Sequence, residues 1–413
     1  MKISVSKAEN DWDVLPLGKL IEIIGGGTPR TSNQEYWGGE IPWLSVVDFN
    51  NDGRWVSSTE KSITELGLNF SSTKLLNKGD LIISARGTVG ALAQLKEDMA
   101  FNQSCYGLRA NDKLASNDFL YYLVKHSLRE ILSNVHGAVF DTITKETFDF
   151  INVSIPPILE QKTIASVLSS LDDKIELLRE QNKTLESIAQ TIFKEWFVNF
   201  NFPHNDGKPY KDSGGEMVES ELGLIPKGWK VGKFGEILSL TMGQSPSSST
   251  YNTDRIGLPL LNGASDLQQD GIYPSKYTSK PRKIGKKNDI LLCIRATIGN
   301  IQISDQEYCI GRGVAAITPT SQYYYFSLFN LKAIIEDLTR NASGSVIKGL
   351  SREDILGRNV VIPPQTISAT YEPIIKHIYI KKAFSEIEVS RLVKLRELLL
   401  PKLIKGGIDI NEV

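Results

Sequence analysis

The chain has 413 residues, 41% of them hydrophobic and 23% charged, with a formal net charge of −1 at pH 7. Such values are typical of a soluble globular protein with two or three domains. We expect no signal peptide and no membrane span, because the first residues lack an apolar core and no apolar run approaches about 18 residues. The three scattered cysteines form no CxxC pair, which predicts a reducing, cytoplasmic location without disulfides or a zinc site.

An internal repeat divides the chain. The segment WDVLPLGKLIEIIGGGTP, which begins at residue 12, resembles WKVGKFGEILSLTMGQSP, which begins 217 residues later. Likewise KGDLIISARGTVG at residues 78–90 matches KNDILLCIRATIG at residues 287–299. This second match pairs Arg86 with Arg295. A repeat of this length predicts two similar globular domains, at residues 1–157 and 229–364, each followed by a long helix.

Within each copy the pattern predicts a mixed α/β domain. The runs LIISA (residues 81–85) and ILLCI (290–294) are apolar and bounded by Gly and Asp, as in buried strands. Residues 119–135 and 323–339 have helical spacing, and each ends near a glycine, Gly137 or Gly344. Thr144 and Ser351 are predicted N-caps of a further short helix in each copy.

Residues 158–200 predict the first long helix, with the narrow apolar seam of a coiled coil. Charged residues such as Asp172 lie between the seam positions, so we expect the other faces to be wet. The alternative is a helix packed only on its own domain, but a strict seam over more than four heptads favours a partner helix. Asn182, the single polar residue at an a position, would fix the register. The predicted seam is Leu168, Leu171, Ile175, Leu178, Asn182, Leu185, Ala189, Ile192 and Trp196.

The linker at residues 201–228 and the second long helix at residues 365–408 complete the chain, before a tail at 409–413. The linker is rich in Gly, Asp and Glu and lacks periodicity, which predicts an exposed crossover between the copies. Its length would let the second helix lie antiparallel on the first. The seam of the second helix is interrupted by Lys382, Ser385 and Arg396, and Pro401 is expected to end or kink it.

Charge is unevenly distributed between the copies. Residues 227–364 contain 17 Lys and Arg against 11 Asp and Glu, whereas residues 1–157 contain 15 against 19. The run SKYTSKPRKIGKKND at residues 275–289 concentrates the basic side chains. A local basic surface can bind phosphates on a neutral chain, although such a run alone is equally typical of a solvated loop.

The motifs of catalysis are missing from the sequence. It contains no GxxxxGK[ST] phosphate loop and no GxGxxG motif in a strand–helix context. An amino-methyltransferase would need an Asn/Asp-Pro-Pro-aromatic motif, whereas isoleucine precedes both Pro-Pro pairs here. We find no metal-ligand cluster and no carboxylate–lysine set typical of a nuclease. The sequence therefore predicts a protein without catalytic or metal-binding residues.

The order of these segments resembles the specificity (S) subunit of type I restriction–modification systems. The resemblance covers essentially the whole chain and includes GGGTPRTSNQEYWGGEIPW, FNQS, IFKEWFVNF, GSVIKGLS and LRELLLPKLIKGGI. It implies an α+β fold with two target-recognition domains separated by an antiparallel coiled coil, each domain reading one half of a bipartite DNA sequence. It also implies helices that set the spacing and dock two modification (methyltransferase) subunits, which restriction (translocase–nuclease) subunits join. S-adenosylmethionine, ATP and Mg²⁺ would be bound by those partners.

Base recognition requires Arg, Lys, Asn, Gln, Asp, Ser or Thr on loops that reach the major groove. In the first domain the candidate DNA-binding residues are Thr28, Arg30, Ser45, Asp48, Arg86, Asn102 and Gln103. In the second they are Ser245, Asn262, Ser265, Asp266, Arg295, Arg312 and Ser345, with Lys280, Arg282, Lys283, Lys286 and Lys287 for phosphates. Because Arg86 and Arg295 share one position, a structural or backbone-contacting role is equally open for them.

Two other classes of protein remain possible at this point. One is a coiled-coil scaffold with two modules that bind protein or glycan. The other is a stand-alone DNA methyltransferase or nuclease with a divergent active site.

Overall fold

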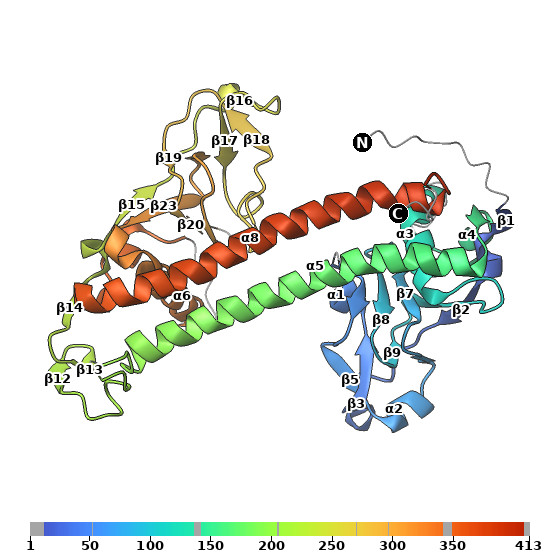
Figure 1. Cartoon of the computed structure of the whole chain (residues 1–413), viewed down its shortest axis with the longest axis horizontal. Coiled ribbons are helices and arrows are strands. Elements are labelled where there is room, and N and C mark those ends of the chain that lie inside the picture. Colours follow the sequence, from blue (N-terminus) through green and yellow to red (C-terminus); the bar gives the residue numbers. More distant parts are fainter. Residues whose placement is uncertain are drawn as a thin grey trace. The chain divides into compact units, whose positions relative to one another are not determined.

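The computed structural model describes residues 12–51, 53–135, 142–204, 206–269, 271–295, 297–341 and 349–408. The chain forms two compact units: unit 1 contains residues 1–181 and 384–413, and unit 2 contains residues 182–383. Each unit holds one globular domain and a part of both long helices, α5 (Ile158–Phe193) and α8 (Gln365–Ile404) (Figure 1). The mixed α and β content and the repeated domain confirm the predicted fold class.

The domain of unit 1 is built on two sheets and a short strand pair. The sheets have the strand orders β2-β10-β7-β8-β4 and β5-β3-β9-β6, and the pair β1–β11 joins the start of the domain to the strand before α5. The strands are β1 (Asp13–Pro16), β2 (Ile21–Gly25), β3 (Trp37–Leu44), β4 (Trp55–Val56), β5 (Lys61–Ile63), β6 (Leu75–Leu76), β7 (Leu81–Ser84), β8 (Leu92–Leu95), β9 (Met99–Phe101), β10 (Cys105–Ala110) and β11 (Asn152–Ile155).

The helices of this domain pack on different parts of it: the longest contacts the larger sheet and both long helices, whereas the second contacts the smaller sheet. They are α1 (Val46–Phe49), α2 (Glu65–Asn69), α3 (Asn117–Val135) and α4 (Lys145–Asp149). The predicted strand at 81–85 is the fully buried β7, and Thr144 is the N-cap of α4 as expected. The predicted end of α3 near Gly137 lies outside the described residues. Apolar side chains of α3, such as Phe119, share one core with Leu168 of α5 and Leu403 of α8.

The domain of unit 2 repeats this topology. Its sheets have the orders β15-β23-β20-β21 and β16-β18-β17-β22-β19, and the pair β14–β24 corresponds to β1–β11. The strands are β14 (Lys230–Lys233), β15 (Leu238–Met242), β16 (Tyr251–Asn252), β17 (Leu258–Leu261), β18 (Lys276–Thr278), β19 (Ile284–Gly285), β20 (Ile290–Cys293), β21 (Ile301–Ile303), β22 (Tyr308–Ile310), β23 (Val314–Pro319) and β24 (Asn359–Ile362). Its helices are α6 (Tyr324–Asn341) and α7 (Arg352–Leu356), the latter N-capped by Ser351 as predicted. The predicted C-cap at Gly344 lies outside the described residues.

The linker prediction was wrong in one respect, because the linker contains a β-hairpin. Strands β12 (Met217–Ser220) and β13 (Gly223–Pro226) pair antiparallel within it. Phe202 and Ile225 of the linker are buried in the same core as Trp229 and Phe197. Burial of these scattered side chains, rather than periodicity, folds the segment onto unit 2.

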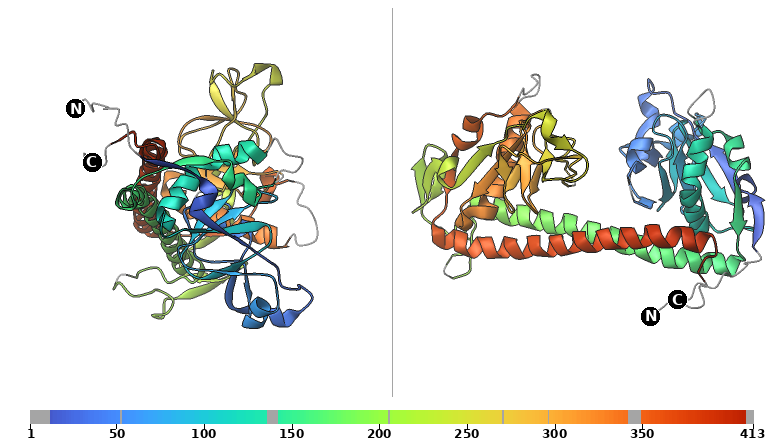
Figure 2. Two further views of the ribbon diagram at one scale, coloured as in Figure 1. Left: turned by 90° about the vertical axis from the view of Figure 1, so that its right-hand side faces the viewer. Right: turned by 90° about the horizontal axis from the view of Figure 1, so that it is seen from above.

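The long helices lie side by side and antiparallel within each unit, as the views in Figures 1 and 2 show. Every predicted seam residue of α5 is buried or half-buried. The α-helical geometry ends at Phe193, earlier than the predicted residue 200, and continues as a π-helical turn over Lys194–Val198. The helix α8 ends at Ile404 rather than at residue 408.

Two residues of the long helices differ from expectation. Pro401 does not end α8, because Leu400, Leu403 and Ile404 are buried in the core of unit 1 and hold the last turn in place. Asp172 is not on a wet face; its side chain is only 3% exposed. A carboxylate can be buried this deeply only with charge and hydrogen-bond partners.

Candidate nucleic-acid interface

Four loops of the first domain meet around the segment Phe101–Ser104, which follows β9. The backbone N–H of Gly27 donates to Phe101 O at 2.9 Å, and that of Asn102 donates to Leu44 O at 3.0 Å. The N–H of Ala85 donates to Ser104 O at 2.8 Å. The loops after β2, β3 and β7 are thereby fixed to the loop after β9, and the predicted DNA-binding residues of this domain lie on these four loops.

The polar side chains of this cluster differ in their exposure and in whether other residues bind them. Gln103 is exposed, and its Oε1 accepts a hydrogen bond from the hydroxyl of Thr28. Arg30 and Arg86 are exposed and form no ion pair with any described residue. Asn102, by contrast, uses its side-chain oxygen to accept the N–H of Ser104 at 3.0 Å. Free cations on ordered loops are the groups that can contact an anionic ligand.

Asp48 supports the cluster from within. Its carboxylate accepts hydrogen bonds from the N–H and hydroxyl of Ser45 at 2.7 and 2.9 Å, and from the N–H of Glu60 at 2.7 Å. These bonds close the turn after β3. Ser45 and Asp48 therefore have a structural task in addition to the base contacts predicted for them.

The second domain builds the same cluster around Ile310–Gly313, which follows β22. The N–H of Gln244 donates to Ile310 O at 2.9 Å, and that of Gly311 donates to Leu261 O at 2.8 Å. The N–H of Ile294 donates to Gly313 O at 2.9 Å. Each bond has its counterpart in the first domain, so the repeat extends from the strands to the loops.

In the second cluster, too, some polar side chains hold the loops and others are exposed. Ser245 accepts the N–H of Arg312 at 3.2 Å, and the exposed guanidinium of Arg312 forms no ion pair with a described residue. Arg295 and Ser265 are also exposed, whereas Asn262 is half-buried. Ser345 lies outside the described residues.

The prediction that Asp266 is exposed was wrong. Its side chain is buried, and its carboxylate accepts the N–H of Asn262 at 2.8 Å and the hydroxyl of Ser275 at 3.3 Å. Asp266 thus closes the turn after β17 as Asp48 closes the turn after β3. A buried aspartate of this kind supports the loop and cannot contact a base.

The basic run of the second domain is divided by strand β19. Lys280, Arg282 and Lys283 precede this strand, and Lys283 O accepts the N–H of Ile310 at 2.9 Å, which places it beside the loop of Arg312. Lys286 and Lys287 follow β19 and lie in the turn before β20, at the opposite end of β20 from Arg295. All five side chains are exposed without an ion pair to a described residue.

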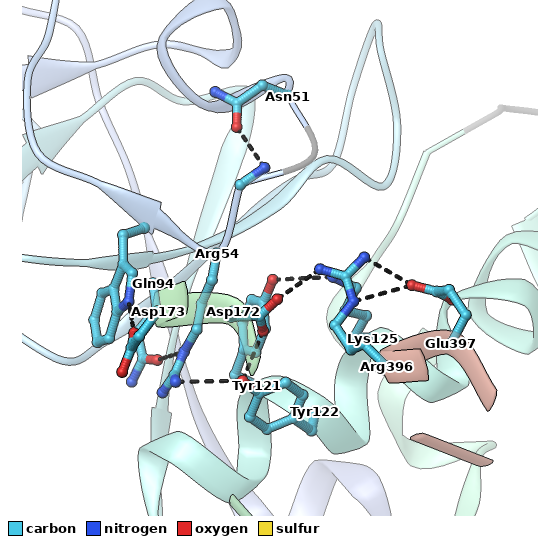
Figure 3. Close-up of polar contacts among 12 residues, drawn as sticks. Asn51, Arg54, Gln94, Tyr121, Tyr122, Lys125, Asp172, Asp173, Arg396 and Glu397 are labelled. Atoms are coloured by element: carbon cyan, nitrogen blue, oxygen red, sulfur yellow. Dashed lines mark hydrogen bonds and ion pairs between the residues drawn. The ribbon is translucent and has the colours of Figure 1, made fainter. Parts of the chain in front are cut away.

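A buried polar network joins the first domain to both long helices (Figure 3). Asp172 of α5 pairs with Arg396 of α8 at 2.6 Å and accepts the Tyr122 hydroxyl of α3 at 2.7 Å. Arg54 donates to the Tyr122 hydroxyl at 3.3 Å and to Gln94 at 2.9 Å. Burial and the neighbouring Asp172 carboxylate raise the pKa of Tyr122, so this hydroxyl remains a donor.

Sequence reasoning missed these network residues. The available signal was Arg396, a charged residue at a position where the seam of the second helix required an apolar one. Its partner Asp172 lies 224 residues away, and no local pattern connects the two.

Unit 2 has a corresponding junction. Glu186 of α5 forms ion pairs with Lys382 of α8 and Lys332 of α6, and it accepts the Tyr379 hydroxyl at 3.1 Å. Although burial opposes ionisation, the two lysines lower the pKa of Glu186 below its ordinary value. Lys382, predicted to interrupt the seam, therefore points toward α5 and joins the two helices.

Two negative findings apply to the described residues. None of the helices among them combines the length and apolar character needed to cross a membrane. No group of three or more His, Cys, Asp or Glu side chains in the same ranges could hold a metal ion.

Comparison with known proteins gives consistent results. The type I restriction enzyme MjaIX specificity subunit of Methanocaldococcus jannaschii is 28% identical, over 99% of this chain and 96% of the relative. The type I restriction enzyme HindI specificity subunit of Haemophilus influenzae is 23% identical, over 81% of this chain and 88% of the relative.

Among solved structures, the type I restriction–modification S subunit from M. genitalium covers 98% of this chain and 99% of its own, with a TM-score of 0.59 and 17% identity. At that identity the likeness supports the fold alone. The family described as type I restriction modification DNA specificity domain matches twice, at residues 9–187 and 226–384. With two equivalent loop clusters and two matching segments, the chain belongs to the type I restriction–modification DNA specificity family.

Proposed function

We propose that this chain is the specificity subunit of a type I restriction–modification complex, in which each domain reads one half of a bipartite DNA target. The observation that carries the proposal is the duplicated loop cluster, which lies within two segments matched by one DNA specificity family. In both clusters arginine side chains are exposed without acidic partners among the described residues. Such side chains can contact phosphates and base edges.

The long helices are proposed to dock two methyltransferase subunits and to set the spacing between the half-sites. Apolar side chains of α5 and α8 share one core within each unit, yet large apolar side chains remain exposed on α8, including Phe384 at 69% and Leu398 at 63%. Exposed apolar side chains grouped on one helix are typical of a surface that a partner covers. Restriction subunits would join the same assembly in the cytoplasm.

Catalysis is assigned to the partners in this proposal. The described residues offer no metal-ligand cluster, and the sequence has no methyltransferase or nucleotide motif. S-adenosylmethionine, ATP and Mg²⁺ would then be bound by the methyltransferase and restriction subunits, while this chain selects the DNA.

The test compares the chain alone with the chain in complex with its methyltransferase subunit. We expect sequence-specific, salt-sensitive DNA binding and methylation of a two-part sequence by the complex, and no methylation by the chain alone. Methylation or cleavage by the chain alone would establish a stand-alone enzyme. A complex with no sequence preference for DNA would favour a scaffold with modules for protein or glycan.

A further inference from the structure

The two loop clusters assign equivalent positions to residues of different type. Strand β9 pairs parallel with β3 so that Leu44 lies opposite Phe101, and β22 pairs parallel with β17 so that Leu261 lies opposite Ile310. Counting forward from Phe101 and from Ile310, Gln103 is equivalent to Arg312. The hydrogen bonds that fix the two loops are equivalent as well, so this match rests on geometry.

Both side chains at this position are exposed, although each loop is fixed on both sides. Phe101 and Ile310, two residues earlier, are fully buried. The side-chain NH₂ of Gln103 and the guanidinium of Arg312 form no hydrogen bond with a described residue. In each loop, hydrogen bonds therefore hold the backbone in place, and one exposed polar side chain can still bind a ligand. Direct recognition of a base requires this arrangement.

One residue in the loop after β2 and one in the loop after β15 form hydrogen bonds with these two exposed residues. Thr28 donates its hydroxyl to Gln103 Oε1, which orients the amide and leaves the second lone pair of that oxygen and the NH₂ group available. Ser245, the counterpart of Thr28, accepts the N–H of Arg312 and fixes the backbone instead. The guanidinium keeps all its donors. In both domains, therefore, a hydroxyl group at the equivalent position stabilises the loop. The exposed side chain is an amide in the first domain and a guanidinium in the second.

The amide of Gln103 and the guanidinium of Arg312 are complementary to different bases. A glutamine amide can donate to N7 and accept from the N6 amino group of adenine, whereas an arginine can donate to both N7 and O6 of guanine. We propose that Gln103 and Arg312 are equivalent base-reading residues, Gln103 selecting an adenine in one half-site and Arg312 a guanine in the other. This inference rests on the proposed function and adds to it the residues and bases of one recognition position.

Arg86 and Arg295 supply a contrast in the same clusters. They follow the equivalent strands β7 and β20, are exposed, and are identical in the two domains. A position that keeps the same cation in domains with different targets is suited to a phosphate contact, which carries no sequence information. Arg295→Ala is thus the matched control for Arg312→Ala, because both remove one exposed guanidinium from the second cluster.

The experiment uses the full chain in complex with its methyltransferase subunit. Bound duplexes are selected from a random library and sequenced for the wild type, Gln103→Arg, Arg312→Gln, Gln103→Ala, Arg312→Ala and Arg295→Ala. We expect Gln103→Arg to change one adenine to guanine in one half-site, and Arg312→Gln to make the opposite change in the other. The Gln103→Ala and Arg312→Ala variants should each lose discrimination at one position by about 10- to 100-fold. Arg295→Ala should weaken binding to all sequences and leave the motif unchanged.

The outcomes separate the inference from the proposed function. Folded Gln103→Arg and Arg312→Gln complexes that select the wild-type motif would overturn the base-reading assignment and leave the proposed function standing. Where an exchange abolishes selection, the alanine variants decide: relaxation at a single position supports the assignment, and an intact motif overturns it. A wild-type complex that selects no two-part sequence would overturn the proposed function itself.

Discussion

At equivalent positions of the two domains, some residues are buried and hold turns, whereas others are exposed. Asp80 and Asp289 are both buried and accept the N–H of the residue three positions earlier, at 2.9 and 2.7 Å. Asp48 and Asp266 close equivalent turns by accepting the N–H of Ser45 and of Asn262. Identity at buried positions thus marks residues that hold turns, and differences at exposed positions mark candidates for specificity. The sequence repeat shows which positions correspond, but only burial shows which of them are free.

The basic run of the second domain gives a prediction about phosphate binding. Replacing Lys283, Lys286 and Lys287 together by alanine should weaken binding to every DNA sequence, because these exposed lysines have no acidic partner among the described residues. The slope of log K against log salt should fall by about 0.9 for each phosphate that the variant no longer neutralises. Binding measured over a salt series checks this. The separate Lys283→Ala and Lys286→Ala/Lys287→Ala variants show which side of β19 faces DNA. An unchanged slope with an altered sequence preference would contradict the assignment.

Glu372 gives a prediction about pH. It accepts the N–H groups of Tyr325 and Phe326 at the start of α6, at 2.9 and 3.0 Å. Burial outweighs these bonds and raises its pKa from 4.5 to about 7. Between those values the folded state binds a proton that the unfolded state lacks, so this contribution to stability is present below pH 4.5 and is lost as pH rises to about 7.

The Glu372→Gln variant tests that sign. The free energy of unfolding of the wild type, relative to this variant, should decline from pH 4.5 to 7 and be constant above that range. Glutamine does not titrate, so it removes the proton linkage while keeping the side-chain length. A difference that stays constant over the whole range would show that Glu372 does not titrate there.

At the scale of elements, the long helices show what local pattern can predict. The seam of α5 could be read from its alternating steps of three and four residues, since apolar burial on one face determines that spacing. The hairpin β12–β13 and the polar contacts of α8 could not be predicted in this way. Lys382 and Arg396 lie where an apolar seam was expected, and their acidic partners are on the other helix.

The two least exposed ion pairs between the long helices have the same polarity, whereas the exposed pair of Lys174 on α5 with Glu388 on α8 has the opposite one. Asp172 and Glu186 lie two heptads apart on α5, and Lys382 and Arg396 lie two heptads apart on α8. In these two pairs, one in each unit, the acid is on α5 and the base is on α8. This arrangement favours pairing of α5 with α8 in one register. A shifted register would leave these charges without their partners, and two copies of one helix would place like charges together.

A double-mutant cycle on Asp172 and Arg396 tests the pairing. Arg396→Met should destabilise unit 1 by about 3–5 kcal/mol, because it leaves the Asp172 carboxylate buried with the Tyr122 hydroxyl but without its cation. Combining it with Asp172→Leu should recover much of that loss. Denaturant unfolding of the four proteins gives the coupling energy. Additive effects of the two substitutions would mean that the pair does not couple the helices.

At the scale of the whole molecule, the repeat predicts that the two domains read DNA independently. Exchanging residues 1–157 for the corresponding domain of another family member should change only one half of the methylated sequence. The loop cluster of the second domain is built entirely from its own strands, so its half-site should be retained. Methylome sequencing of cells that express the chimera with its methyltransferase checks this. A chimera that alters both halves would contradict independent reading.

The last prediction concerns the spacing between the half-sites. A seven-residue insertion after Leu185 keeps the seam in phase but moves Glu186 away from Lys382. A matching seven-residue insertion after Lys382 places the original residues of α5 and α8 opposite each other again. The ion pairs Asp172–Arg396 and Glu186–Lys382 are then both kept. The paired insertions lengthen each helix by about 10 Å, which corresponds to about three base pairs of B-DNA.

The half-sites should keep their sequences while the unread gap between them grows by about three base pairs, because the loop clusters are untouched. Such a gap also rotates one half-site by roughly 100° about the DNA axis, at about 10 base pairs per turn. Twisting the DNA or the helices to compensate costs free energy, so we expect weaker binding along with the new gap. The methylated motif of the variant gives the gap directly. The single insertion after Leu185 serves as the control and should be less stable than the paired variant. A stable, active paired variant that still methylates the original sequence would show that contacts outside the helices set the distance.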